Sequence, residues 1–447
     1  MNLKFRMFHT ANAKLADGYS RSDLLSISDA DFERRHGFIQ WAFPTIKRTR
    51  QFSNAPTLDL TSAIWLSERQ DVTDFLEAMT VRFLEFLASN NHWKSHYNHN
   101  HLRISRAIDS LRVLHSWELS NWFYNKVIEL AGDSFEQMEL SNRYWSRHVS
   151  SIHDRIAGAF VGLAIGDALG APVEFSPRGT FEPVTAYREG GRFNLPAGAW
   201  TDDTAMALCL AQVLINNEGL EPTRLLESFC NWAEHGSNTS TGVAVGIGQN
   251  TLRVLGDYRR NGYLEALPFG SKNDGNGSLM RLAPVACYAH DDVDQAIHLA
   301  SQQSRATHAS RPADQSCQVV AELLCGLING RKFDELWLAA SKRNWGQAVG
   351  SLFGYNYTEL NSDNVAAGGY VIDTLHAALW SLSNTDTFEK AVIKAVNLGD
   401  DADTVGAVVG QLAGAMYGYA SVPVHLKKTL IDERKLYVTS QFLSSRT

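Results

Sequence analysis

Residues 158–170, GAFVGLAIGDALG, and residues 406–418, GAVVGQLAGAMYG, carry glycine at every fourth position of a long apolar stretch. Residues four apart lie on the same face of an α-helix. A glycine in a helix interior costs about 1 kcal/mol relative to alanine, so a row of them needs a compensating gain. Close approach of two helix backbones supplies that gain. We therefore expect both stretches to be helices at the centre of an α-helical domain.

The composition is that of a globular protein with room for two domains. The chain has 447 residues, of which 44% are hydrophobic and 20% are charged, and its 11 prolines are too few for a disordered or fibrous chain. A net charge of −7 disfavours sequence-independent binding to nucleic acid. The five cysteines include no C-x-x-C pair, which fits a reducing cytoplasm better than a disulfide framework. The longest apolar stretch, about 156–173, is interrupted by Asp167 and several glycines, so we expect no membrane segment.

The composition changes near residue 150. Six of the 11 tryptophans precede this point, and most of the 33 glycines follow it. Apolar residues recur at three- and four-residue steps from Val72 to Leu87, which predicts a helix, and two more helices are expected over about 101–114 and 118–131. We predict an all-α chain with a smaller helical domain over 1–148 and a multi-helical domain over 149–447.

Two features of the first domain leave alternatives open. The aromatic segment 36–44, HGFIQWAFP, is flanked by five basic residues, and it either docks a macromolecular partner or fills the domain's own core. The four histidines 92, 96, 99 and 101 suggest a metal cluster, but without cysteine we favour polar loop and cap residues. The flanking basic residues are Arg34, Arg35, Lys47, Arg48 and Arg50.

Two acidic clusters each precede a predicted helix. The first comprises Thr201, Asp202 and Asp203, and ordinary helix capping by Thr201 would explain it if it stood alone. The second comprises Asp401, Asp403 and Thr404 at the start of the second glycine row. Converging carboxylates repel one another unless a cation lies between them, and hard oxygen ligands suit Mg²⁺ or Mn²⁺ rather than zinc. Taken together, the two clusters predict a metal site.

Three further elements are candidates for the same site. Glu174 follows Pro172, where the first glycine-rich helix must end, so its carboxylate could reach the metal or activate a water. Asp167 lies in that helix, and we assign it to substrate binding, with a buried hydrogen-bond acceptor as the alternative. A glycine-rich turn with exposed N–H groups can cradle a diphosphate, and a THAS segment with His308 forms a further wall. The turn residues are Gly275, Asn276, Gly277 and Ser278.

Taken in order, GDALGAPVEF, WTDDTAMAL, GNGSLMR, THAS and GDDADTVGAVVGQLAGAMYG resemble the ADP-ribosylglycohydrolase family over about residues 152–420. The resemblance implies an all-α fold and a binuclear Mg²⁺ centre, with Mn²⁺ as a second candidate ion. It implies that Gly275, Asn276, Gly277, Ser278 and His308 line an ADP-ribose pocket. The implied metal-site and catalytic residues are Glu174, Thr201, Asp202, Asp203, Asp401, Asp403 and Thr404, with Glu174 and Asp203 assigned to catalysis. Residues 25–130 resemble the conserved region of the opioid growth factor receptor family, which implies no known chemistry.

Two departures from the family pattern bear on the acceptor. Asp400 stands where many relatives have glycine, which adds a charge beside the ligands. The loop 234–239 lacks the aspartate that bacterial enzymes acting on ADP-ribosyl-arginine tend to carry near there. The GDALGAPVEF and WTDDTAMAL segments nevertheless look closest to the arginine-type branch, so arginine is the expected acceptor, ahead of serine, aspartate or glutamate.

The expected reaction is metal-dependent hydrolysis at the distal ribose of ADP-ribosylated proteins, with Glu174 activating water. A phosphoesterase acting on ADP-ribose would use the same acids. A third alternative is an ADP-ribose-binding or immunity-type protein that neutralises an ADP-ribosylating toxin, with the toxin or another macromolecule held by the first domain.

Overall fold

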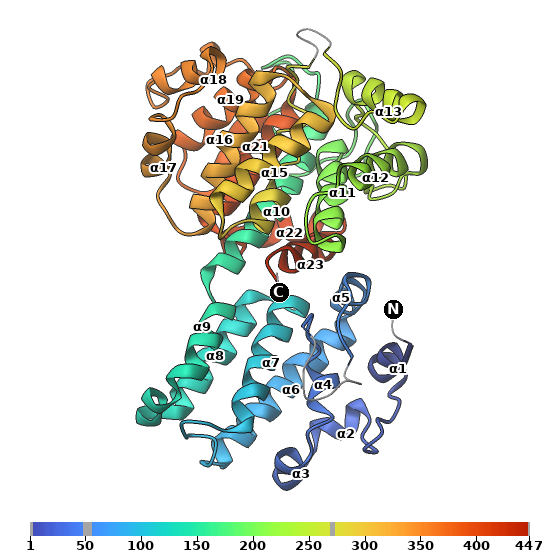
Figure 1. Ribbon diagram of the computed structural model, residues 1–447, viewed down its shortest axis with the longest axis vertical. Helices are drawn as coiled ribbons and strands as arrows, with labels where there is room; N and C mark the ends of the chain where they lie inside the picture. The colour runs from blue at the N-terminus through green and yellow to red at the C-terminus, as the bar shows by residue number, and fades with distance from the viewer. Residues whose placement is uncertain (1–2, 48–55, 269–272, 446–447) are drawn as a thin grey trace. The chain divides into compact units, whose positions relative to one another are not determined.

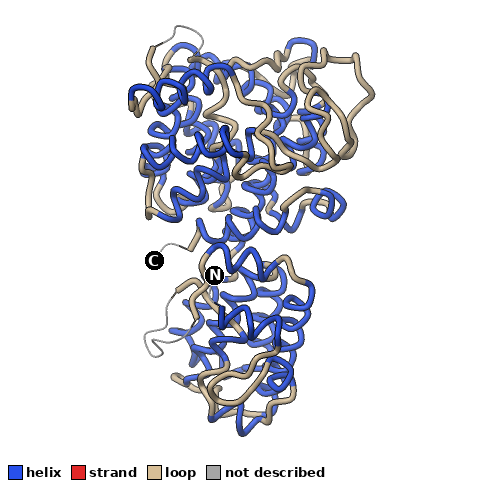
Figure 2. The backbone as a smooth tube through the Cα atoms, turned by 90° about the vertical axis from the view of Figure 1, so that its right-hand side faces the viewer, coloured by secondary structure: helices blue, strands red, loops and turns tan. Residues whose placement is uncertain are grey.

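A computed structural model describes residues 3–47, 56–268 and 273–445, and it consists of helices joined by loops (Figures 1 and 2). These residues form no β-strand, only isolated bridges such as that between Gly275 and Tyr370. The prediction of an all-α fold is therefore confirmed. The chain divides into two compact units, Met1–His153 and Asp154–Arg446.

The first unit is built from short and medium helices around an aromatic core. The predicted helices over 72–87, 101–114 and 118–131 are confirmed as α6, α7 and α8. The helices of this unit are α1 (Leu3–Ala11), α2 (Arg21–Leu25), α3 (Asp29–Arg34), α4 (Ile39–Ala42), α5 (Leu60–Ser67), α6 (Gln70–Ser89), α7 (His99–Leu114), α8 (Trp117–Ala131), the 3-10 helix η1 (Gly132–Met138) and α9 (Glu139–His148).

The aromatic segment 36–44 belongs to this core. Phe38 and Phe43 are fully buried, and the Phe38 ring packs edge-on against Phe32 at a centroid distance of 5.1 Å. The docking alternative for these rings is thus ruled out by their burial. Of the basic residues that flank the segment, Arg48 and Arg50 lie outside the described residues.

Histidines 92, 96, 99 and 101 of the first unit do not converge on one point. His101 bonds to the Trp93 carbonyl and the Ser141 hydroxyl, and His96 bonds to the Gln137 carbonyl. His92 and His99 each approach the carboxylate of Glu33 instead. The interpretation of these histidines as loop and cap residues fits these contacts, and the metal-cluster alternative does not.

The second unit surrounds two central helices, α10 (Ser151–Gly170) and α21 (Ala402–Tyr417). Figure 1 shows them between α11–α13 on one side and α16–α19 on the other. The remaining helices are η2 (Ala171–Val173), α11 (Asp202–Asn216), α12 (Pro222–His235), α13 (Gln249–Asn261), α14 (Ala283–Tyr288), α15 (Val293–Thr307), α16 (Arg311–Ile328), α17 (Phe333–Ala340), α18 (Gln347–Ser351), η3 (Leu352–Gly354), η4 (Ser362–Asn364), α19 (Val371–Ser383), α20 (Phe388–Val396), η5 (Tyr419–Ser421), α22 (Val424–Thr429) and α23 (Glu433–Leu443).

The two glycine rows face each other along α10 and α21, which run antiparallel. A Cβ atom added to Gly158, Gly162 or Gly166 would overlap the carbonyl oxygen of its partner in α21. The partners are Gly414, Gly410 and Gly406 in that order, and Gly170 meets the backbone of Ala402 and Asp403. Gly418 differs from the prediction, because it ends α21 in a left-handed conformation (φ 81°) instead of continuing the row.

One helical stretch, residues 117–173, is long and apolar enough to span a membrane by length and composition. Its most apolar 18-residue window is 94% buried inside the protein, as expected for a core helix. This burial follows from the position of α10, whose residues from Ile156 to Gly170 are all buried.

We predict that Gly166→Ala lowers the free energy of unfolding by about 2 kcal/mol, because the new methyl group must push two packed backbones apart. Gly350→Ala in α18 is the matched control, since a Cβ there meets only one ordinary contact, at 3.9 Å. That control should be neutral or stabilising by about 0.5 kcal/mol. Urea unfolding measures the free energy of unfolding of both variants. Equal free energies for the two variants would contradict the packing of α10 against α21.

Candidate active site

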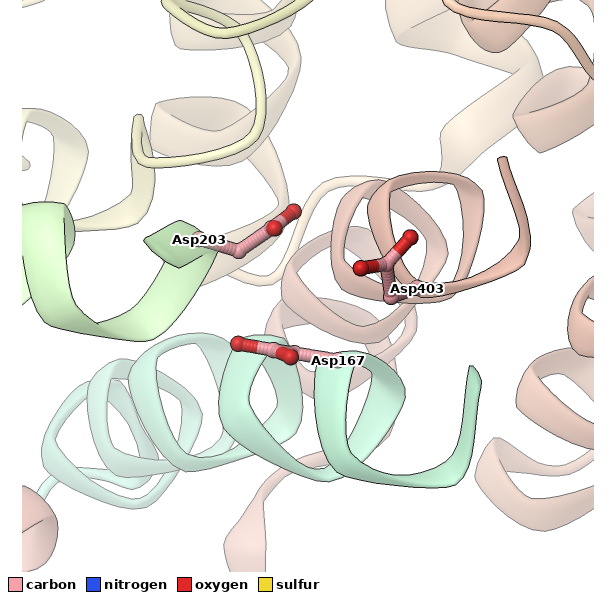
Figure 3. A group of neighbouring side chains, drawn as sticks. All are labelled: Asp167, Asp203 and Asp403. Carbon is pink, nitrogen blue, oxygen red and sulfur yellow. The ribbon is translucent and has the colours of Figure 1, made fainter. Parts of the chain in front are cut away.

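Three helices each supply one carboxylate to a common point. Asp167 comes from α10, Asp203 from the first turn of α11 and Asp403 from the first turn of α21 (Figure 3). One oxygen from each lies within 4.8 Å of the others, and Glu174, Asp401 and Asp403 form a second group of the same size. Asp403 belongs to both groups, so the two predicted acidic clusters and Glu174 are brought together.

Asp167 fixes the start of α11. Its carboxylate accepts hydrogen bonds from the backbone N–H of Thr201 at 2.9 Å and of Thr204 at 3.0 Å. It also accepts from the two threonine hydroxyls, at 2.8 and 2.6 Å. Thr201 is the N-cap residue, as predicted, but its hydroxyl caps no N–H group of the helix and donates to Asp167 instead.

Several oxygens in this cluster lie close together without a donor from the rest of the protein. The Thr201 hydroxyl oxygen lies 3.3 Å from Asp203 and 3.4 Å from Asp403, yet its single proton goes to Asp167 at the shorter distance. Oδ1 of Asp203 and Oε2 of Glu174 are buried without any hydrogen-bond partner. Buried acceptors are normally paired, so these oxygens indicate room for a cation.

Burial raises the pKa of every carboxyl group in the cluster. Desolvation, reinforced by the charge of Asp401, raises the pKa of Glu174 to about 8. Desolvation also raises the pKa of Asp167 to about 6, against the four hydrogen bonds that favour its ionised form. The pKa values of Asp202, Asp203 and Asp403 are raised well above the ordinary range, again mainly by burial, and that of Asp401 is raised as well.

The donor set fits Mg²⁺ or Mn²⁺. All the converging ligand atoms are carboxylate and hydroxyl oxygens, the ligands that these hard cations prefer. The residues predicted to hold them are Thr201, Asp202, Asp203, Asp401, Asp403 and Thr404. A divalent cation would offset the mutual repulsion that otherwise keeps these groups protonated.

Glu174, Asp202, Asp400, Asp401 and Asp403 form the acidic end of a cavity of about 480 Å³, whereas Asp203 does not line it. The predicted glycine-rich turn lies beside it, because the Asn276 side-chain amide donates to Asp401 at 2.7 Å and to the Thr374 hydroxyl at 2.9 Å. The lining residues are Glu174, Phe175, Asp202, Gly246, Gly248, Gln249, Asn250, Thr251, Gly275, Asn276, Gly277, Met280, His308, Gly368, Gly369, Asp400, Asp401, Asp403 and Thr404.

Two residues predicted to bind substrate do not line this cavity. Asp167 is fully buried under the start of α11, and the fully buried Ser278 hydroxyl bonds to that of Ser304 at 2.9 Å. Both side chains hold the cavity wall in place, because their polar atoms are already paired within the protein. Of the residues predicted to bind substrate, Gly275, Asn276, Gly277 and His308 do line the cavity.

His308 is held in one tautomer by a relay of hydrogen bonds. The buried guanidinium of Arg281 donates to the Thr307 hydroxyl at 2.8 Å, and that hydroxyl lies 2.8 Å from Nδ1 of His308. Arginine has only donors, so the Thr307 hydroxyl accepts from Arg281 and has its own proton to donate to Nδ1, the arrangement in which the hydrogen of the ring is on Nε2. Burial and the charge of Arg281 lower the pKa of His308 to about 3, so the ring is neutral at pH 7.

The sequence predictions missed part of the lining. Residues 246, 248–251 and 368–369 lie outside the motifs quoted above, whereas Phe175 and Met280 lie within GDALGAPVEF and GNGSLMR but were not predicted to line the site. The one signal for the loop residues is clustered glycine, at Gly242, Gly246 and Gly248 and in the pair Gly368–Gly369, which marks loops. By contrast, the loop 234–239, singled out for its missing aspartate, contributes no lining residue.

Comparison with known proteins agrees with this geometry. The family model described as ADP-ribosylglycohydrolase matches residues 148–445. The chain belongs to the ADP-ribosylglycohydrolase family. The first unit lies almost entirely outside the match, and the resemblance of residues 25–130 to the opioid growth factor receptor stays a prediction.

The chain matches most of the length of several individual relatives. An ADP-ribosylarginine hydrolase, Tri1, of Serratia proteamaculans is 39% identical, over 63% of this chain and 77% of that protein. The ADP-ribosyl-[dinitrogen reductase] glycohydrolase of Rhodospirillum rubrum is 32% identical, over 61% of this chain and 89% of that protein. A solved structure titled ADP-ribosylglycohydrolase-related protein complex has a TM-score of 0.59 at 36% identity, covering 66% of this chain and 98% of that one. The predicted enzyme class, a glycohydrolase, is therefore confirmed.

We predict that the metal-free protein loses thermal stability as the pH rises from 5 to 8. A carboxyl group with a raised pKa stabilises the fold while protonated, and Glu174 loses that contribution as the pH passes from its ordinary value of 4.5 through about 8. Millimolar Mg²⁺ should raise the melting temperature at pH 8 by about 5 °C, and by much less at pH 5. Sodium chloride at equal ionic strength is the control for screening. An equal effect of the two salts would contradict a specific cation site.

Proposed function

We propose that this enzyme hydrolyses the bond between the distal ribose and the guanidinium nitrogen of ADP-ribosyl-arginine in proteins, and that it uses two Mg²⁺ ions, with Mn²⁺ as a substitute. The convergence of Asp167, Asp203 and Asp403 from three helices carries the proposal. Two groups of carboxylates that share Asp403 offer places for two ions. The name of the Serratia relative supports arginine as the acceptor.

The bound cations would balance the carboxylates and hold the ribose hydroxyl groups. Thr201, Asp202, Asp203, Asp401, Asp403 and Thr404 would hold these ions. This assignment leaves Glu174, whose Oε2 has no partner inside the protein, free to act on substrate and water.

Glu174 has the position of a general base. It lines the cavity and belongs to the group with Asp401 and Asp403, so its carboxylate sits where the ribose must lie for the ions to hold it. It takes a proton from the attacking water while the C1 atom of the ribose loses its bond to the guanidinium nitrogen. Burial and the charge of Asp401 raise the pKa of Glu174 in the metal-free protein, and bound cations would lower it, so that the carboxylate is ionised and can accept the proton.

Other residues of the chain hold the rest of ADP-ribose. The N–H of Asn276 already donates to the Gly369 carbonyl at 3.2 Å, so the N–H groups of Gly275 and Gly277 are the ones that would bind a diphosphate. Nε2 of His308 lies next to Gly277 and would add a donor. Asn276 keeps the turn against the acids through its bond to Asp401. In this arrangement the diphosphate would lie beside the turn and the scissile bond beside Glu174.

We predict that Glu174→Gln lowers kcat at least about 100-fold while the Kd for ADP-ribose changes less than about threefold, because an amide can accept a hydrogen bond but cannot take a proton. Calorimetry and a hydrolysis assay on ADP-ribosyl-arginine measure the two quantities. Glu182→Gln, at an exposed position that does not line the cavity, is the control and should match the wild type. Equal losses in kcat and in affinity for ADP-ribose would indicate that Glu174 mainly binds the metal or the substrate.

The same assay tests the reaction. Free ADP-ribose as the product, lost on chelation and restored by Mg²⁺, is the expected result. AMP would indicate a phosphoesterase, and binding without turnover would indicate a binding or immunity-type protein. Release of ADP-ribose from ADP-ribosyl-serine but not from ADP-ribosyl-arginine would overturn the assignment of arginine as the acceptor.

We further propose that residues 1–148 bind a macromolecular partner, such as the modified protein or an ADP-ribosylating toxin, and that the enzyme works in the cytoplasm. All lining residues of the cavity belong to the second unit, which supports a division of labour. The five cysteines are free and buried, which fits a reducing compartment.

We predict that a chain starting at Val149, which keeps α10 whole, retains kcat/KM on a small ADP-ribosyl-arginine substrate within about threefold. The reason is that no lining residue is removed. Circular dichroism establishes that the shortened chain folds, and a folded but inactive chain would show that the first unit completes the site.

A further inference from the structure

Phe175 is the one large apolar side chain in the cavity lining that is mostly exposed. It lines the acidic end, directly after Glu174, and 56% of it remains exposed. Its backbone is in the left-handed region, with φ at 63°. A bulky residue there costs about 1–3 kcal/mol, and such strain persists mainly where the surroundings enforce it. A smaller or polar residue would satisfy the fold equally well, so the ring needs another explanation.

The neighbouring backbone enforces this conformation. The N–H of Phe175 donates to the carbonyl of Asp400 at 2.6 Å, and the N–H of Asp400 donates to the carbonyl of Ser176 at 2.9 Å. Asp400 is itself left-handed, with φ at 54°. The two bonds tie the segment after α10 to the segment before α21, so the ring is fixed relative to the acids that both segments supply.

A guanidinium group already lies on this ring. The Arg192 guanidinium carbon is 4.7 Å from the centre of the Phe175 ring, within the range of a cation–π contact. Phe175 therefore accepts a planar cation on one face of its ring, and the same side chain lines the cavity, whereas Arg192 does not.

We propose that Phe175 determines specificity by binding the guanidinium group of the modified arginine, and that Arg192 covers the same face until substrate displaces it. This inference rests on the proposed function, in which the scissile bond joins the distal ribose to a guanidinium nitrogen. That nitrogen must lie beside the residue that acts on the ribose, and Phe175 is the chain neighbour of Glu174. The adenine ring is the other planar group of the substrate, but it lies at the far end of ADP-ribose, beyond the diphosphate.

Three variants of the full-length Mg²⁺ enzyme test the proposal on ADP-ribosyl-arginine. Phe175→Leu should raise KM about tenfold, as expected for loss of a partly desolvated cation–π contact, whereas Phe175→Tyr should restore it. Arg192→Ala should lower KM about threefold, because the competing guanidinium is gone. Arg188→Ala is the matched control, since Arg188 lies over Phe181 at 5.9 Å, and neither residue lines the cavity.

A second readout separates the guanidinium from the rest of the substrate. The Kd for free ADP-ribose should change less than about twofold in Phe175→Leu. Equal weakening of ADP-ribose and substrate would overturn the proposal in favour of a contact with ADP-ribose itself. An unchanged KM in both Phe175→Leu and Arg192→Ala would also overturn it, and Arg192→Ala alone decides if Phe175→Leu does not fold.

Failure of the role proposed for Phe175 can be distinguished from failure of the proposed function. A wild-type enzyme that releases ADP-ribose from arginine while Phe175→Leu keeps its KM leaves the function intact and removes only the role of Phe175. A wild-type enzyme that does not cleave the arginine linkage overturns both.

Discussion

The close contact between the backbones of α10 and α21 determines where two of the clustered carboxylates lie. Glycine faces glycine at Gly158–Gly414, Gly162–Gly410 and Gly166–Gly406, and no side chain could fit between them. The contact fixes the register as well as the distance. Because Asp167 follows Gly166 and Asp403 precedes Gly406 by three residues, the register that joins the glycines also joins the carboxylates.

The third helix is held by the acid that the first one contributes. Asp167 bonds to the backbone N–H groups of Thr201 and Thr204, so α11 can begin only where this carboxylate lies. Its charge also raises the pKa of Asp202 and Asp203, which makes the metal-free cluster costly. Stability is thus lowered at the acidic cluster, a common property of functional sites.

Much of the fold and of the site could be predicted from the sequence, because the signals for them lie within short segments of the chain. Glycine rows, helix periodicity and acids at helix starts are patterns within a few residues, so α6, α10, α21 and the two acidic clusters were foreseeable. The burial of Asp167 and Ser278 behind the wall depends on partners such as Thr204 and Ser304, 37 and 26 residues away, and no local pattern reveals them. Loop residues such as Asn250 were missed for the same reason, since a glycine-rich loop shows that the chain turns but not where it goes.

The aspartate at position 400 shows how a departure from the family pattern can fit the site. Its φ of 54° explains why glycine serves at this position, and aspartate is among the side chains that tolerate this conformation best. Its carboxylate lines the cavity and adds to the effect of burial in raising the pKa of Asp401, so it adds to the negative charge at this end of the cavity. The same charge attracts a guanidinium toward the ring of Phe175, whose backbone Asp400 holds. Replacement of glycine by aspartate therefore increases the demand for cations at this end of the cavity without displacing any of the predicted ligands.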